Sequence, residues 1–151
     1  MMKSLMAAAA LVSLGACTSM EDKLGLNIPT YVVTLAPGAG ITSTGSGDGI
    51  FTLDTATLVL GYTVNYKGLT GPATMAHIHG PAEAGANAGV VVPLAAATGT
   101  QIVGTVTLTE AQVAELKAGK YYVNIHTAAN KGGEIRGQIT QFMMPEVRFE
   151  R

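Results

Sequence analysis

The chain lacks most of the residues that usually reveal a protein's chemistry. Its 151 residues include no tryptophan, one cysteine and three histidines, and 13% of them are charged. A single cysteine excludes an intramolecular disulfide, so packing alone has to stabilise the fold. Nine basic residues against ten acidic ones give a net charge of −1. We therefore expect no nucleic-acid partner, because there is no basic track to bind phosphates.

Two common catalytic motifs are also missing. There is no Gly-x-Ser-x-Gly elbow for a nucleophilic serine. The Gly- and Ser-rich stretch 37–49 has neither the spacing nor the lysine of a Walker phosphate loop. We interpret this stretch as a flexible hairpin connection without chemistry of its own.

The N-terminus reads MMKSLMAAAALVSLGAC, with a basic Lys3, an apolar run and small residues before the cysteine. This pattern predicts a signal peptide over residues 1–16, and the apolar run is too short to span a bilayer. The residues Leu14-Gly15-Ala16-Cys17 resemble the lipobox of bacterial lipoproteins. The resemblance implies cleavage before Cys17 and acylation of its thiol and its new amino end. The alternative is an ordinary signal peptide with an incidental cysteine.

The predicted lipid anchor sets the expected location. Thr18 follows the cysteine, and the resemblance to lipoproteins then favours the outer membrane of a bacterial cell envelope, facing the periplasm or the cell surface. Residues 17–29 have no hydrophobic period and are interpreted as a tether between lipid and domain. We expect the folded domain over residues 30–144 and a short C-terminal tail over residues 145–151.

The rest of the chain consists of β-branched runs separated by turn residues, which is typical of an all-β antiparallel sandwich or barrel. One segment has a helical pattern. Thr109 and Gln112 form a capping box, Val113 and Leu116 share one face, and Gly119 ends the segment. We predict one short helix at about Thr109–Ala118.

The three histidines lie in two predicted strands. His77 and His79 stand in TMAHIHG, and His126 stands in KYYVNIHT. Residues i and i+2 of a strand share a face, with Cα atoms about 6.5–7 Å apart. Both imidazoles can then tilt toward one metal ion at about 2.0–2.1 Å. We predict that the two strands meet and that the histidines form a metal site, the alternative being polar side chains on a solvated face.

Neighbouring polar residues have predicted roles at this site. Tyr122 and Asn124 share the face of His126, and Tyr122 is interpreted as a further ligand or hydrogen-bond donor, or as an anchor of the sheet face through its hydroxyl group. The strand GGEIRGQ is expected to pair with that of His126. Arg136 would steer a small anion such as superoxide, and Glu134 would bind the far nitrogen of an imidazole. The alternative is a Glu134–Arg136 ion pair.

Three segments together carry a family resemblance: AHIHGPAEAG, VVVPL and LTEAQVAELKAGKYYVNIHTAANKGGEIRGQI. They resemble the CHRD (chordin) domain family over about Tyr31 to Phe142. The family occurs in bacterial secreted proteins and lipoproteins and, repeated, in the animal morphogen antagonist chordin. It implies no settled activity for most bacterial members. By analogy with chordin, the alternative function is a non-enzymatic module that presents the loops Gly80–Gly89 and Ala128–Gly133 to a protein or matrix partner.

A second resemblance concerns the chemistry. A His-x-His strand followed by a Gly-containing loop is similar to the Greek-key β-sandwich of copper-zinc superoxide dismutases. His77 and His79 match the paired copper ligands, and His126 matches the late-strand copper histidine. No histidine remains for a bridging ligand, and no zinc set or disulfide can be identified, which excludes a two-metal site.

The resemblance therefore implies a mononuclear site for copper or iron, with zinc as a further candidate and superoxide dismutation as the expected reaction if the ion is redox-active. A zinc hydrolase built on the same imidazoles would need Glu83 or Glu134 as its general base.

Overall fold

A computed structural model describes residues 28–95 and 99–143 of the chain. The predicted signal peptide 1–16, Cys17, nearly all of the tether and the tail 145–151 lie outside the described residues. Within the described part, no helix has the length and apolar character needed to cross a membrane.

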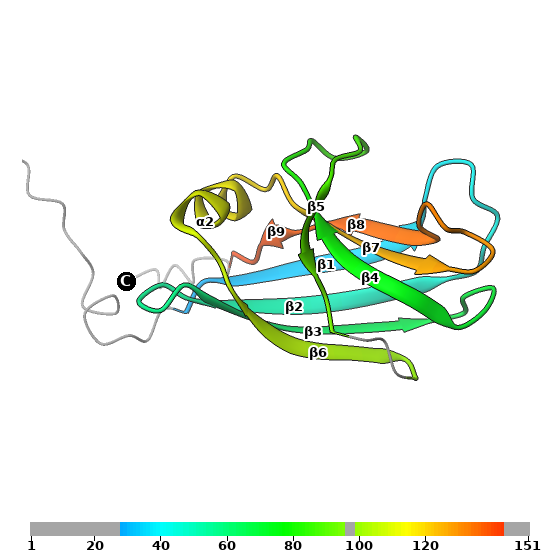
Figure 1. The fold of residues 1–151 in the computed structure, drawn as a ribbon, viewed down its shortest axis with the longest axis horizontal. Helices are drawn as coiled ribbons and strands as arrows, with labels where there is room; N and C mark the ends of the chain where they lie inside the picture. Colours follow the sequence, from blue (N-terminus) through cyan, green and yellow to red (C-terminus); the bar gives the residue numbers. More distant parts are fainter. Residues whose placement is uncertain (1–27, 96–98, 144–151) are drawn as a thin grey trace, which may run out of the picture.

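Nine strands form one strongly curved antiparallel sheet, and one short helix lies beside it in the described residues (Figure 1). This confirms the predicted all-β fold with a single short helix. The strand order is β5-β4-β7-β8-β1-β2-β3-β6, and β9 pairs with β1. The elements are β1 (Thr30–Pro37), β2 (Ser46–Asp54), β3 (Val59–Lys67), β4 (Ala73–His79), β5 (Val90–Pro93), β6 (Gln101–Thr107), α2 (Glu110–Lys117), β7 (Tyr122–Thr127), β8 (Ile135–Gln138) and β9 (Thr140–Gln141).

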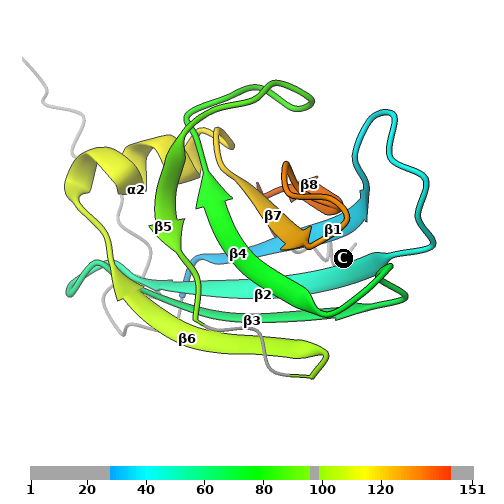
Figure 2. The same ribbon diagram turned by 45° about the vertical axis from the view of Figure 1, so that its right-hand side comes forward.

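Strand β1 joins the two halves of the sheet. Its first residues pair with β2, from Thr30 opposite Thr52 to Leu35 opposite Gly47. Its last two residues pair instead with β8, where Ala36 lies opposite Arg136. The sheet therefore folds over itself into a nearly closed barrel, with β4 and β5 crossing over β2, β3 and β6 (Figure 2). Strands β5 and β6 are the two ends of the sheet.

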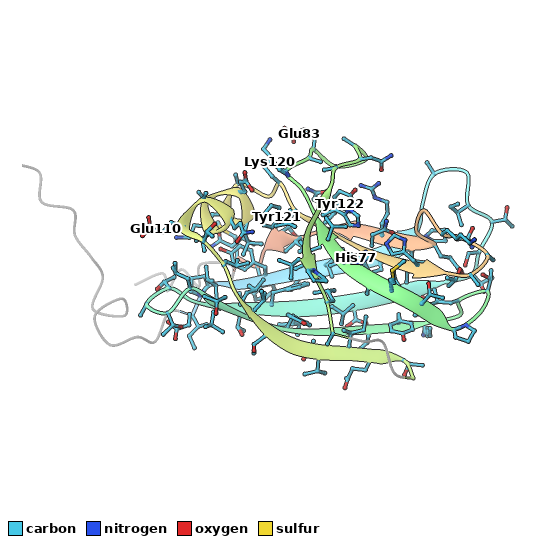
Figure 3. The ribbon with its side chains drawn as sticks, viewed as in Figure 1. His77, Glu83, Glu110, Lys120, Tyr121 and Tyr122 are labelled. Atoms are coloured by element: carbon cyan, nitrogen blue, oxygen red, sulfur yellow. The ribbon has the colours of Figure 1, made fainter. Side chains whose placement is uncertain are left out.

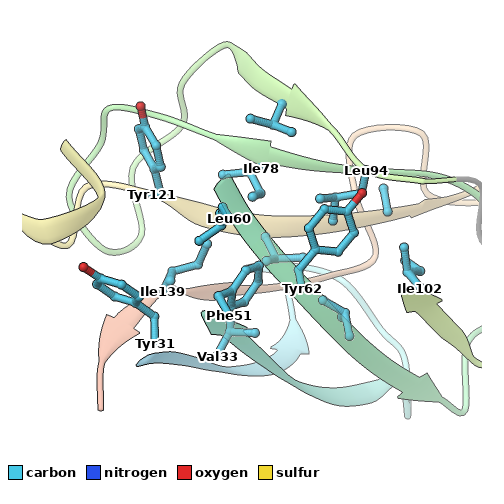
Figure 4. Packing of buried hydrophobic residues seen from close by; sticks show 14 of the residues in the cluster. Tyr31, Val33, Phe51, Leu60, Tyr62, Ile78, Leu94, Ile102, Tyr121 and Ile139 are labelled. Atoms are coloured by element: carbon cyan, nitrogen blue, oxygen red, sulfur yellow. The ribbon is translucent and has the colours of Figure 1, made fainter. Parts of the chain in front are cut away.

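The core follows from the alternation of side chains along each strand. In β3, the residues Leu60, Tyr62 and Val64 are buried and the residues between them are partly exposed. Buried residues of β4, such as Ile78, face them across the barrel (Figure 4). Each fully buried Leu, Ile or Phe side chain stabilises the fold by about 1.5–3 kcal/mol. The same alternation turns the intervening residues of β4 and β7 to the outer face of the sheet, where those of β7 are nevertheless buried.

The helix forms where the sequence predicts it. The Thr109 side chain accepts a hydrogen bond from the Gln112 backbone, and the Gln112 side chain accepts one from the Thr109 backbone. Val113 and Leu116 are buried against the barrel. The predicted range is longer than the observed helix only because it includes the two cap residues.

One prediction about the strands needs correction. Strand β2 begins at Ser46, inside the stretch interpreted as a loop, because its glycines allow close strand packing: a Cβ atom on Gly49 would lie 2.9 Å from Val33 Cγ1. The run IFTLDTATLVLGYTVNY contains the end of β2 and nearly all of β3. Asp54 accepts hydrogen bonds from the backbone of Ala56 and Thr57, which closes a turn between β2 and β3.

Candidate metal centre

The outer face of the β4–β7 pair carries all three histidines. In β4, Ala76 and Ile78 point into the core, so His77 and His79 point outward. Strand β7 runs antiparallel to β4, with His77 opposite Asn124 and His79 opposite Tyr122. His126 lies one pair further along β7 and therefore sits diagonal to His77. The predicted meeting of the two strands is confirmed.

The three imidazoles converge. His77 Nδ1 lies 3.1 Å from His126 Nε2, and one nitrogen from each of the three rings lies within 4.8 Å of the others. Two nitrogen ligands at about 2.0–2.1 Å from one ion are themselves about 3.0–3.5 Å apart. The separation of His77 and His126 therefore matches a pair of ligands to one ion, and without an ion it is that of a hydrogen bond between the two rings.

Hydrogen bonds to backbone carbonyl groups orient two of the rings. His79 Nδ1 lies 3.0 Å from Ala88 O, and His126 Nδ1 lies 2.9 Å from Lys131 O. A carbonyl oxygen can only accept, so both Nδ1 atoms donate, and the neutral tautomer with this hydrogen has its lone pair on Nε2. This is the arrangement by which outer hydrogen bonds set the tautomer of metal-binding histidines. No residue pattern predicts these partners, because backbone carbonyl groups belong to every residue type.

His79 Nε2 is buried and has no hydrogen-bond partner among the described residues. Most buried polar atoms are hydrogen-bonded, and an unpaired one costs free energy. A metal ion would satisfy this lone pair. His79 itself belongs to the cluster of three histidines whose rings converge.

The cluster also favours the neutral, metal-binding form of His77. Burial lowers the pKa of His77, and the neighbouring His126 and His79 lower it further. A neutral imidazole has the lone pair that a metal ion needs.

Tyr122 packs against the face of the His79 ring. Its ring stacks on the imidazole at 5.1 Å between centroids, with an angle of 11° between the planes. Its hydroxyl group accepts a hydrogen bond from Ala88 N at 3.1 Å. Figure 3 shows that His77 and Tyr122 both lie over the β4–β7 pair. Of the roles predicted for Tyr122, this hydrogen bond corresponds to that of an anchor, because the hydroxyl group binds the backbone of the 80–89 loop.

Arg136 covers the other face of Tyr122. Its Cζ atom lies 3.8 Å from the centre of the Tyr122 ring. The guanidinium group donates hydrogen bonds to Asn87 Oδ1 and Ala86 O, both at 2.6 Å. Arg136 thus binds the 80–89 loop to the sheet and keeps its charge one aromatic ring away from His79. The described residues contain no Glu134–Arg136 ion pair.

Asn124 and Glu134 contact neighbouring loops rather than imidazoles. Asn124 Nδ2 donates to Gly132 O at 3.0 Å. Glu134 is fully buried, and its carboxylate accepts hydrogen bonds from a ring of donors: Ser43 Oγ at 2.5 Å, Thr70 N at 2.8 Å, Thr70 Oγ1 at 2.6 Å, Thr127 Oγ1 at 2.7 Å and Asn130 Nδ2 at 3.1 Å.

The predicted bond from Glu134 to an imidazole is therefore wrong. Gly133 has φ +115, and Glu134 precedes the first residue of β8, so its side chain does not follow the alternation expected of a continuous strand. The chain turns the carboxylate toward Thr127, which is itself buried. Glu134 acts on the site only indirectly, because it anchors the loop whose Lys131 carbonyl group binds His126.

A hollow of about 300 Å³ lies beside the site. Asn87, Asn124 and Arg136 contribute polar groups to its lining, together with Asn130 and several glycines. A larger hollow of about 490 Å³, lined by Asp48, Asn65 and Lys67 among others, is formed by other strands. No histidine lines either of them.

The comparison with protein families covers both histidine strands. The family model described as CHRD domain matches residues 31–139. The chain belongs to the CHRD domain family. The match extends from β1 to the residue after β8, so the whole histidine cluster lies within the CHRD domain. Searches of curated proteins and of solved structures found no match.

Proposed function

We propose that this CHRD-domain protein binds one transition metal ion through His77, His79 and His126. Copper and iron are the leading candidates, and zinc is the third. The observation that carries the proposal is the convergence of the three imidazoles, one nitrogen of each lying within 4.8 Å of the others, together with a buried Nε2 atom of His79 that has no hydrogen-bond partner among the described residues.

The alternative of a non-enzymatic binding module predicts histidines that act separately as polar surface residues. Imidazoles well over 6 Å apart would have favoured that alternative, but the ligand atoms lie within 4.8 Å of one another. His77 Nδ1 and His126 Nε2 are within hydrogen-bond distance of each other, whereas His79 Nε2 has no partner among the described residues. The convergence therefore supports a metal site over a display surface.

A redox role is the second part of the proposal. A bound copper or iron ion would supply one-electron chemistry at a position that the three histidines leave open. The protein's own contribution is the positive charge of Arg136, which packs on the same Tyr122 ring that stacks on His79. Such a charge raises the local concentration of a small anion, and superoxide dismutation is the reaction that fits these features.

A zinc hydrolase fits the structure less well, because no carboxylate joins the histidine cluster in the described residues. Glu83 is exposed and pairs with Lys120 in the 80–89 loop region (Figure 3). Glu134 is buried within its own ring of hydrogen bonds. Neither residue is placed to act as a general base at the site.

We also propose that the protein is anchored in a bacterial cell envelope by lipid on Cys17, in the outer membrane facing the periplasm or the surface. The support is the leader sequence with its lipobox. Several acyl chains, at about 0.8 kcal/mol per buried methylene, hold a small domain on a membrane essentially permanently. A Cys17→Ala variant should appear in the soluble fraction, whereas the parent protein should fractionate with membranes.

Elemental analysis tests the metal site. The full chain, purified in mild detergent without a histidine tag, should contain about one equivalent of copper or iron. A His77→Ala/His79→Ala variant should contain none. Thr105→Ala, an exposed change on β6, is the control and should keep the metal. The proposal fails if the parent protein takes up no stoichiometric copper, iron or zinc after reconstitution, or if the double variant retains it.

A further inference from the structure

Met75 lies beside the three histidines. It precedes His77 by two positions on β4, with the buried Ala76 between them, and it pairs directly with His126 of β7. Met75 and the histidines therefore share the outer face of the β4–β7 pair. Its side chain is 51% exposed, so it does not belong to the core.

A methionine at this position is unusual within the chain. Met75 is the only methionine between Met20 and Met143. Other exposed apolar residues on the strands are β-branched: Ile50, Val90 and Val103. Strands favour β-branched residues, and core packing does not explain an exposed, flexible thioether.

The sulfur atom of Met75 is within reach of an ion held by the histidines. Residues directly opposite in an antiparallel pair have Cβ atoms about 4.5–5.5 Å apart, and methionine has three rotatable side-chain bonds. An ion bound by both His77 Nδ1 and His126 Nε2 would lie between the two residues that neighbour Met75, one along β4 and one across it.

We propose that Met75 is a fourth ligand of this site and makes it selective for copper, above all for Cu(I). This inference rests on the proposed three-histidine site and narrows its metal. A thioether is a soft ligand that suits Cu(I), whereas the protein ligands of Zn²⁺ are typically Cys, His, Asp and Glu. Three imidazoles and one thioether supply four ligands to Cu(I) without any carboxylate, which agrees with a cluster that contains none. The fourth position would be open to an anion only when the flexible, soft thioether leaves the ion, as it would after oxidation to Cu(II).

The test compares the full chain with its Met75→Leu variant in detergent. Leucine keeps the volume and the apolar character of the side chain but has no sulfur, so the fold should be retained. Met143→Leu, which changes an exposed methionine near the end of the described residues, is the matched control. Cu(I) affinity is measured without oxygen against a chromophoric Cu(I) chelator, and Zn²⁺ affinity against a chromophoric zinc indicator.

Met75→Leu should weaken Cu(I) binding by at least about tenfold and change Zn²⁺ binding by less than about threefold. X-ray absorption of the Cu(I)-loaded parent protein should show a sulfur scatterer bonded to copper that Met75→Leu loses and Met143→Leu keeps. If Met75→Leu binds Cu(I) as tightly as the parent and the parent shows no sulfur scatterer, the thioether ligand is wrong and the three-histidine site stands. If the parent binds neither ion, both proposals fail.

Discussion

His77 Nδ1 and His126 Nε2 lie 3.1 Å apart although 49 residues separate them in the sequence. The contact results from the pairing of β4 with β7, whose inner faces contribute Ile78, Val123 and Ile125 to the core. The strands that hold the candidate ligands are therefore fixed by the same packing that stabilises the barrel. The site is preorganised, because no described segment has to fold before an ion can bind.

The first prediction concerns pH. Imidazoles bind metal only when neutral, and their usual pKa is about 6.5. The pKa of His77 is lowered by burial and by its histidine neighbours, so this ring stays neutral to a lower pH than a free imidazole. Affinity should be constant above neutral pH and fall by about tenfold or more between pH 7 and pH 5.

Metal retained after gel filtration over this pH range gives the measurement. Circular dichroism at each pH is the control that separates proton competition from unfolding. An affinity that is unchanged at pH 5 in the folded protein would contradict binding through three histidines.

The second prediction separates the ring of Tyr122 from its hydroxyl group. Tyr122→Phe keeps the stacking on His79 and should retain one equivalent of metal. The loss of the acceptor for Ala88 N should lower the free energy of unfolding by about 1–2 kcal/mol. Tyr122→Ala removes the ring and should weaken metal binding. Loss of the metal in Tyr122→Phe would show instead that the hydroxyl group is itself a ligand.

The third prediction concerns Arg136. Arg136→Gln loses the contact with the Tyr122 ring and weakens the hydrogen bonds to Asn87 and Ala86. The free energy of unfolding should fall by about 1–2 kcal/mol, and amide exchange in residues 85–88 should become faster. Lys67→Gln, an exposed charge change on β3, should alter neither.

Arg136→Lys tests the two roles of the side chain separately. Lysine keeps the positive charge but cannot stack and bind two acceptors in the manner of a planar guanidinium group. If the charge attracts superoxide, the rate of dismutation in this variant should keep its dependence on salt concentration. Amide exchange in the 80–89 loop should nevertheless become faster. Equal loop protection in Arg136→Lys and the parent would contradict the role of Arg136 in holding the loop.

The sequence was sufficient to predict the parts of the site that depend on strand alternation. The spacing of His77 and His79 places them on one face in any strand, and the count of histidines left only His126 as a third imidazole. The helix was predictable for a similar reason, because the capping box is a local signal around Thr109.

The features that were missed depend on contacts between distant segments. The Ala88 and Lys131 carbonyl groups that orient the rings carry no side-chain signal. The role of Glu134 depends on Ser43 and Thr70, which lie 91 and 64 residues away in the sequence. The conformation of Gly133 then turns Glu134 away from the imidazoles, and periodicity alone does not predict such an interruption.

The fourth prediction concerns the stability conferred by Glu134. Burial alone would raise the pKa of this carboxyl group, but hydrogen bonds from Ser43, Thr70 and Thr127 outweigh it and lower the pKa to about 2. A carboxyl group of the unfolded chain has a pKa near 4.5. The ionised Glu134 side chain therefore contributes its full stabilisation of the folded state at pH values above 4.5. This contribution is lost as the pH falls from 4.5 toward 2.

Glu134→Gln removes the charge but leaves the donors in place. Two of them, Thr70 N and Asn130 Nδ2, cannot accept a hydrogen bond from the new amide group, so an amide nitrogen placed at either carboxylate oxygen faces a donor. The free energy of unfolding in urea should fall by about 2–4 kcal/mol at pH 7. Glu83→Gln, whose parent side chain is 78% exposed, should cost less than about 1 kcal/mol.

The pH dependence distinguishes loss of the carboxylate from general damage to the fold. Because the contribution of the Glu134 carboxylate disappears on protonation, the difference in stability between the parent and Glu134→Gln should shrink as the pH falls below 4.5. A packing defect would give a difference that does not change with pH. If Glu134→Gln unfolds at the same urea concentration as the parent at pH 7, the buried hydrogen bonds of this carboxylate do not stabilise the loops around the site.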